Sequence, residues 1–130
     1  MASIFSRIVV GEIPCHKIYE DDNFLAFLDV FPLVKGHTLV IPKKEIDYIF
    51  DIEDELLAEM ILFSKKVAHA IKKTIPCIKV GVSVIGLEVP HAHIHLIPMN
   101  NVSEMNFSQP KLTFERVEME KIASDIRANI

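Results

Sequence analysis

The most regular hydrophobic pattern lies in the middle of the chain. Apolar residues recur every three or four positions from about Glu53 to Thr74, the spacing of one buried helix face. The side chains expected in this buried stripe are Leu57, Met60, Ile61, Ser64, Ala68 and Ile71. A second repeat starts at about Glu115, and Ile4 to Val10 fits another short helix. The pattern therefore predicts one long helix and one or two shorter helices.

Between these helices, short runs of apolar and β-branched residues end at turn residues or at proline, as strands do. The expected strands are His16–Glu20, Phe24–Leu28, Gly36–Ile41, Ile78–Ile85 and His91–Ile97. The first two flank Asp21-Asp22-Asn23 and form a hairpin, and Ile78–Ile85 is apolar enough for a buried strand. This order predicts an α+β fold with a mainly antiparallel five-stranded sheet.

Composition fits a single globular domain over residues 1–130, with 50% apolar and 25% charged residues. Residues 99–130 form a C-terminal tail, a polar irregular loop followed by the last helix. Its expected buried face consists of Met119, Ile122, Ala123 and Ile126. No repeat or low-complexity linker divides the chain.

Net charge, hydropathy and cysteine content indicate which classes of partner and which cellular location to expect. A formal net charge of −4 argues against non-specific nucleic-acid binding. No apolar run approaches the roughly 18–20 residues that span a bilayer, and the first residues do not resemble a signal peptide. Two cysteines, Cys15 and Cys77, are too few for a disulfide scaffold. We expect a cytoplasmic protein with reduced thiols and no nucleic-acid or membrane partner.

Three histidines, His91, His93 and His95, alternate with apolar residues along the last expected strand. Alternate strand residues share a face and lie roughly 6.5–7 Å apart, so the pattern predicts a row of imidazoles along which a phosphate could lie. Imidazole, with a pKa near 6.5, is mostly neutral and nucleophilic at pH 7. A covalent phosphohistidine would split hydrolysis into two easier displacements.

Metal binding is the main alternative. His-x-His on a strand supplies two zinc ligands, and a third histidine completes a catalytic site of the three-histidine type. A metal-dependent hydrolase with His91, His93 and His95 as ligands is therefore a second interpretation. The spacing by itself favours neither metal nor phosphoryl chemistry.

The stretch His91 to Ile97 follows the motif His-φ-His-φ-His-φ-φ, where φ is apolar, and resembles the signature of the histidine triad family. The resemblance continues through most of the chain. The further matching blocks are Ile4–Ile8, Gly11–Pro14, Tyr19–Asp22, Ala26–Asp29 and Gly36–Lys43.

This resemblance implies the fold of that family and a homodimer that needs no cofactor. It also implies hydrolysis of nucleoside phosphoramidates or related conjugates, such as adenylylated amines and dinucleoside polyphosphates. By position, His93 matches the nucleophile and His95 the residue at the phosphate and leaving group, while His91 and His37 orient this pair. Asp29 matches the acid that hydrogen-bonds the ribose hydroxyls, a role that suits a two-oxygen acceptor.

The purine slot implied by the resemblance is apolar, and the phosphate would contact backbone N–H groups near Glu88 and Val89. The residues that match the slot are Ile4, Phe5, Ile8, Phe27, Leu28 and Val30. Without the resemblance, the aromatic and aliphatic members would be ordinary core residues, Asp29 a turn residue, and His37 a buried hydrogen-bonded histidine.

The chain departs from the family pattern at two kinds of site. Ser3, Ser6 and Glu45 stand where many relatives have two cysteines and a histidine that bind a structural zinc with the first triad histidine, so we expect no metal. Leu87 and Val80 replace a glutamine and an asparagine. These two replacements favour an alternative in which the protein binds or senses a nucleotide and hydrolyses it only weakly.

Overall fold

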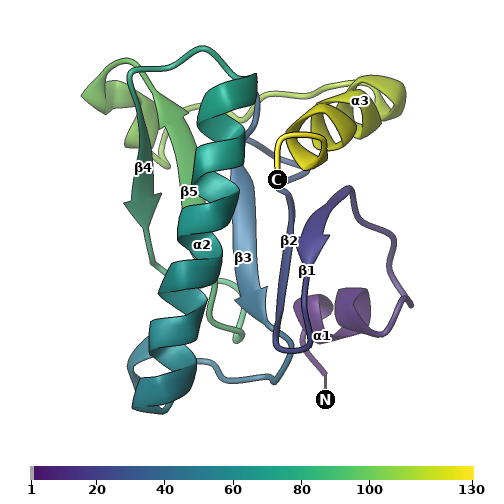
Figure 1. Cartoon of the computed structure of the whole chain (residues 1–130), viewed down its shortest axis with the longest axis vertical. Helices are drawn as coiled ribbons and strands as arrows, with labels where there is room; N and C mark the ends of the chain where they lie inside the picture. Colours follow the sequence, from purple (N-terminus) through teal and green to yellow (C-terminus); the bar gives the residue numbers. More distant parts are fainter. Residues whose placement is uncertain (1) are drawn as a thin grey trace.

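The computed structural model describes residues 2–130 and contains a five-stranded sheet flanked by helices (Figure 1). The strands lie in the order β1-β2-β3-β5-β4, and every neighbouring pair is antiparallel. Their bounds are β1 Lys17–Glu20, β2 Phe24–Leu28, β3 Thr38–Pro42, β4 Lys79–Ser83 and β5 Ile94–Met99. The helices are α1 Ile4–Val9, α2 Asp54–Thr74 and α3 Arg116–Arg127, with short 3-10 helices η1 Ile49–Asp51 and η2 Val102–Met105. The predicted α+β class and antiparallel sheet are confirmed.

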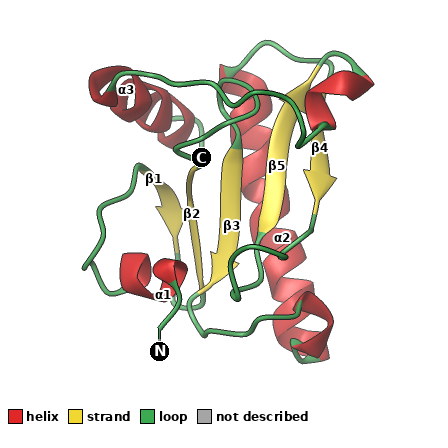
Figure 2. Ribbon diagram, turned by 180° about the vertical axis from the view of Figure 1, so that it is seen from behind, coloured by secondary structure: helices red, strands yellow, loops and turns green. Residues whose placement is uncertain are grey.

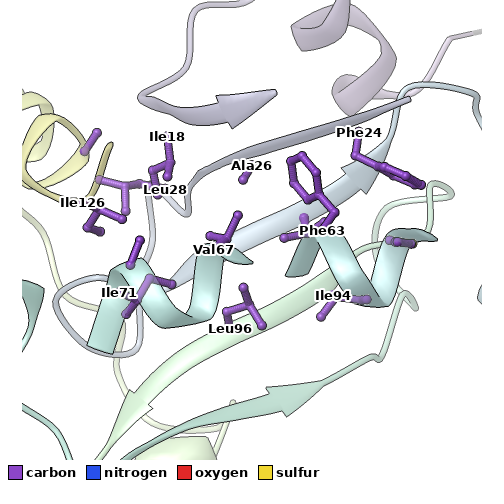
Figure 3. Close-up of a cluster of buried hydrophobic side chains, with 14 of the residues drawn as sticks. Ile18, Phe24, Ala26, Leu28, Phe63, Val67, Ile71, Ile94, Leu96 and Ile126 are labelled. Atoms are coloured by element: carbon purple, nitrogen blue, oxygen red, sulfur yellow. The ribbon is translucent and has the colours of Figure 1, made fainter. Parts of the chain in front are cut away.

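The main hydrophobic core lies between α2, α3 and one face of the sheet, the face turned toward the viewer in Figure 1. Alternate positions of β2 and β5 meet the buried side of α2 there, as Figure 3 shows. These side chains include Phe24, Ala26, Leu28, Phe63, Val67, Ile71, Ile94 and Leu96. Burial of a large apolar side chain contributes roughly 1.5–3 kcal/mol, so this layer dominates the stability of the fold.

The opposite face of the sheet carries a second, smaller apolar cluster beneath α1. In Figure 2, seen from behind, α2 lies behind the strands and this face is turned toward the viewer. The cluster consists of Phe5, Leu25, Phe27, Leu39 and Ile41. Because β2 is buried at all five of its positions, both faces of the sheet are covered along this strand. This second face builds the candidate site.

The two longer helices begin within about one residue of the predicted positions, and α2 ends at Thr74 as predicted. All four side chains predicted for the buried face of α3 are buried, so this part of the tail belongs to the main core. The stripe predicted for α2 is partly wrong, because Ile61 is 52% exposed while Phe63, Val67 and Ala70 are buried. The buried face of α2 is rotated about the helix axis by part of a turn from the predicted face. Within residues 2–130, no helix is both long and apolar enough to cross a membrane.

Two strand predictions need correction. The segment Ile78–Ile85 is not a buried strand, because β4 lies at the edge of the sheet and pairs only with β5. Val82 in this strand is 62% exposed. The last strand begins at Ile94 and not at His91, so the first two triad histidines precede it.

Candidate active site

A cavity of about 560 Å³ lies on the α1 side of the sheet. All the residues predicted to bind a nucleotide line it: Ile4, Phe5, Ile8, Phe27, Leu28, Asp29, Val30, Glu88 and Val89. His37, His93 and His95, three of the four predicted catalytic histidines, line the same cavity. The apolar residues surround one part of it, and the histidines come from β3 and β5 or the residues next to them.

His91 is the exception, because it is fully buried and does not line the cavity. Its Nε2 lies 2.8 Å from the carbonyl oxygen of Pro42, and its Nδ1 lies 2.8 Å from the hydroxyl of Ser3. The predicted row of three triad imidazoles is therefore wrong, since strand alternation starts only at Ile94. Both ring nitrogens of His91 are engaged by the protein, so the three triad histidines do not converge as one set of metal ligands.

The histidines that do lie side by side are His93, His95 and His37. The ring centroids of His93 and His95 are 5.0 Å apart, and those of His95 and His37 are 5.2 Å apart. Strand pairing explains the second contact: β3 and β5 are neighbours, and Thr38, the residue after His37, pairs with Leu96, the residue after His95. The site thus recruits the separate histidine in place of the first member of the triad.

Hydrogen-bond partners assign the tautomers of His37 and His95. The backbone N–H of Leu33 donates to Nδ1 of His37 at 3.0 Å, so this nitrogen carries no proton. The proton of neutral His37 therefore lies on Nε2, which donates to Nδ1 of His95 at 2.9 Å. Because Nδ1 of His95 accepts, the proton of neutral His95 lies on its own Nε2. His95 can thus present an N–H donor.

His93 has the opposite tautomer. Its Nδ1 lies 2.7 Å from the carbonyl oxygen of His91, and a carbonyl only accepts, so Nδ1 carries the proton. The Nε2 atom is left with a free lone pair. The edge contact with Phe5, whose ring centroid lies 5.0 Å from that of His93, helps to hold the ring. The site therefore sets a nucleophilic nitrogen on His93 beside an N–H donor on His95.

Burial keeps three histidines, His37, His95 and His91, neutral. It is the main cause that lowers the pKa of His37 to about 3, followed by the neighbouring His95. Burial, and then the neighbouring His93, lowers the pKa of His95 to about 4. Burial also lowers the pKa of His91. At neutral pH His37, His91 and His95 are therefore uncharged, and His37 and His95 have the tautomers given above.

Acid should destabilise the fold for the same reason. The ordinary histidine pKa is 6.5, so below that pH the unfolded chain binds more protons than the folded chain. Stability is fully present above pH 6.5 and is lost as the pH falls toward about 4, by roughly 1.4 kcal/mol per pH unit for each of His37 and His95. Urea unfolding at pH 7, 6 and 5 measures this loss, and His95→Gln should have the shallower pH dependence. Equal stability of the wild-type protein at pH 7 and 5 would contradict the assignment.

Asp29 directly follows β2 and lies at the cavity wall. One carboxylate oxygen accepts the backbone N–H of Phe31 at 2.9 Å, and the other lies 3.6 Å from Nε2 of His37. Burial is the main cause that raises the pKa of this carboxyl. Protonation of Asp29 in acid therefore favours the folded state and offsets part of the stability that is lost through the histidines. Because His37 is neutral, the short separation is not an ion pair, and the carboxylate keeps acceptor capacity for ligand hydroxyls.

Asp29, His37 and His95 bring potential ligand atoms within 4.8 Å of one another, which raises the question of a metal site. A metal on Nε2 of His37 would have to displace its proton. That proton cannot move to Nδ1, since Nδ1 already faces the N–H of Leu33. The hydrogen bonding of this group therefore fits a proton-bearing pair of histidines and not a metal ligand set.

Ser3, Ser6 and Glu45, which stand where many relatives have zinc ligands, lie close together in the structure. Glu45 accepts hydrogen bonds from the backbone N–H of Ser3 and from the hydroxyl of Ser6, both at 2.6 Å. The Ser3 hydroxyl in turn contacts His91. Hydroxyls and one carboxylate replace the thiolates and imidazole that a tetrahedral zinc site needs, so these residues do not fit zinc. Instead of a zinc ion, hydrogen bonds connect the start of α1 to His91.

Sequence reasoning missed two lining residues in the segment after η2. The ring centroid of Phe107 lies 4.7 Å from that of His95 and 6.2 Å from that of His37, and Lys111 lines the cavity beside them. The segment looked like a polar irregular tail. A single aromatic residue within it was the only local signal. Leu87, which stands in place of a glutamine, also lines the cavity.

Comparison with known proteins finds similar sequences over most of the chain. Residues 10–102 match the model of the HIT domain family. An adenosine 5'-monophosphoramidase of Schizosaccharomyces pombe is 33% identical over 132 residues, which cover 100% of this chain and 99% of that protein. A HIT-like protein of Borreliella burgdorferi is 35% identical over 135 residues, covering 98% of this chain and 97% of that protein.

Solved structures give the same result. A Hit-like protein of Bartonella henselae superposes with a TM-score of 0.86 at 34% identity, covering 98% of this chain and 96% of that one. A Zn-bound histidine triad family protein of Mycobacterium smegmatis superposes with a TM-score of 0.84 at 30% identity, covering 99% and 93%. The sequence match over most of the chain and the shared fold show that this protein belongs to the histidine triad (HIT) family.

Proposed function

We propose that this protein is a nucleotide-binding hydrolase that cleaves nucleoside phosphoramidates or related nucleotide conjugates through a covalent nucleotidyl intermediate on His93. The observation that carries the proposal is the pair of opposite tautomers: the free lone pair on Nε2 of His93 beside the N–H on Nε2 of His95. A displacement at phosphorus needs both a nucleophile and a donor for the departing group.

Each part of the substrate has a complementary wall in the cavity. The purine lies between apolar side chains, which discriminate poorly among bases, so we expect broad purine tolerance. The ribose hydroxyls donate to Asp29, whose carboxylate faces the same cavity. The phosphate lies near the backbone N–H groups of Glu88 and Val89 and beside His93.

In the first chemical step, Nε2 of His93 forms a bond to the α-phosphorus while the bond from phosphorus to the leaving group breaks. The negative phosphate next to His95 raises its pKa, so that the ring takes up a proton when the substrate binds and becomes an imidazolium. The leaving nitrogen or oxygen then takes the proton from Nε2 of His95, and the ring returns to its neutral form. In the second step, water attacks phosphorus, the bond to His93 breaks, and the water proton returns to His95. His37 and His91 act as positioning residues through their hydrogen bonds.

Turnover of adenosine 5'-phosphoramidate by the purified protein tests the proposal. We expect release of AMP and ammonia, with the same rate before and after treatment with EDTA. Absence of AMP would contradict the hydrolase assignment. Loss of activity in EDTA that added zinc restores would favour metal-dependent hydrolysis.

A nucleotide-binding or sensing role with weak hydrolysis is the second candidate. Leu87 is 89% exposed at the rim of the cavity and offers no amide to a phosphate. Val80, on the edge strand β4, likewise offers no polar group. Tight binding of AMP without measurable turnover of the phosphoramidate would favour this role.

We also propose that two copies pair through β4 and α2. The edge strand has unpaired backbone groups along one side, and Ile78 and Val82 are 64% and 62% exposed. Ile61 and Leu62 on α2 are 52% and 65% exposed. Sedimentation equilibrium should give twice the chain mass, and a monomer at micromolar concentration would contradict this. We also propose a cytoplasmic location, where thiols such as those of Cys15 and Cys77 stay reduced.

A further inference from the structure

The segment from Phe107 to Leu112 contributes two residues, Phe107 and Lys111, to one wall of the cavity. Phe107 packs with its edge against His95, at a centroid distance of 4.7 Å. The backbone N–H of Leu112 donates to the carbonyl oxygen of Pro32 at 2.8 Å, which attaches the segment to the loop after β2. The wall is therefore held at both ends, by the contact of Phe107 with His95 and by the hydrogen bond of Leu112.

Lys111 adds a fixed positive charge to this wall. Its ammonium donates to the carbonyl oxygens of Phe107 at 2.5 Å and of Gln109 at 3.1 Å. An ammonium has three donors, so one remains for a ligand. Among the lining residues, all of which belong to residues 2–130, Lys111 is the one lysine or arginine. Its charge also lowers the pKa of His37, after the larger effects of burial and His95, and it opposes the effect of burial on the pKa of Asp29.

The other parts of a nucleotide already have binding groups in the proposed function, on which this inference rests. The purine, the ribose and the α-phosphate are assigned to the apolar slot, to Asp29 and to the surroundings of His93. We assign the leaving group to the part of the cavity next to Phe107, which contacts His95 and whose carbonyl oxygen accepts from Lys111. A cation in that position stabilises an anion and does nothing for a neutral amine.

We propose that Lys111 is a specificity-determining residue that favours leaving groups with a negative charge, a carboxylate or a phosphate, a few bonds beyond the scissile bond. Phe107 forms the apolar floor under such a group and keeps water away from His95. The preference is modest, roughly tenfold, because Lys111 is exposed and its attraction is screened by solvent and salt.

Paired substrates whose leaving groups differ in negative charge test this inference. One pair is AMP joined through nitrogen to alanine, with a free carboxylate, and to alaninamide. A second pair is AMP joined through nitrogen to 2-aminoethyl phosphate and to ethanolamine. For the wild-type protein we expect kcat/KM to be about tenfold higher for the charged member of at least one pair. The pair with the larger ratio identifies the preferred anion.

Substitutions of Lys111 attribute the preference to its charge. Lys111→Met should bring the ratio of the two kcat/KM values to about one, and Lys111→Arg should keep most of it. Lys72→Met, on the exposed side of α2, is the matched control and should keep the wild-type ratio. A wild-type ratio near one in both pairs, or an unchanged ratio in Lys111→Met, overturns the inference alone. No hydrolysis of any of the four substrates overturns the proposed function and this inference with it.

Discussion

The variant His93→Ala should lose turnover of adenosine 5'-phosphoramidate by several orders of magnitude, roughly 10³-fold to 10⁵-fold. Removal of the imidazole removes the lone pair on Nε2 that forms the bond to phosphorus. What remains is positioning by the cavity and the electrostatic effect of the neighbouring groups. Nucleotide affinity should change little, because the base and ribose contact other side chains, Phe5, Phe27 and Asp29 among them.

Steady-state kinetics and calorimetric titration with AMP measure these two quantities separately. His69→Ala is the matched control, since His69 lies on the exposed side of α2 and outside the cavity, and it should keep wild-type turnover. Near-normal turnover in His93→Ala would exclude the covalent mechanism. A loss of AMP affinity as large as the loss of rate would instead indicate that His93 serves mainly in binding.

His95→Ala should slow the reaction by an amount that depends on the leaving group. For an alkylamine leaving group, which needs a proton as it departs, we expect a loss of roughly 10²-fold to 10⁴-fold in kcat/KM. For AMP p-nitrophenyl ester, whose leaving group departs as a stable anion, the loss should be far smaller. The difference follows from the tautomer assigned to His95, with its proton on Nε2.

The comparison of the two substrates on one variant provides its own control, because misfolding or poor binding would reduce both rates equally. Equal losses would therefore show that His95 acts in positioning and not as a proton donor. His95→Gln adds a second check, since its amide N–H can replace the hydrogen bond but cannot transfer a proton. It should recover binding and leave the rate with the alkylamine low.

Local pattern was sufficient to predict most of the fold. The 3.6-residue repeat located α2 and α3, and the buried face predicted for α3 is the one observed. The pattern failed at β4, because an apolar β-branched run does not indicate whether a strand lies inside a sheet or at its edge. That distinction depends on the order β1-β2-β3-β5-β4, which comes from long-range pairing.

The candidate site was predicted in part, and its geometry shows why the prediction stopped where it did. The motif predicted His93 and His95 as neighbours, which they are, but the strand begins only after both His91 and His93, and His91 is fully buried outside the cavity. The approach of His37 to His95 follows from pairing of β3 with β5. Phe107 and Lys111 reach the cavity from a segment without regular structure, so no local periodicity could have identified them.

The most direct test of the central claim is capture of the intermediate on His93. The wild-type protein is mixed with a nucleoside phosphoramidate labelled at the α-phosphorus and quenched within milliseconds in alkaline denaturant, which preserves histidine–phosphorus bonds. We predict label on the peptide that contains His93, formed and lost at rates that match turnover, and no label in His93→Ala. Active turnover without labelled protein, or label that persists in His93→Ala, would contradict the covalent mechanism.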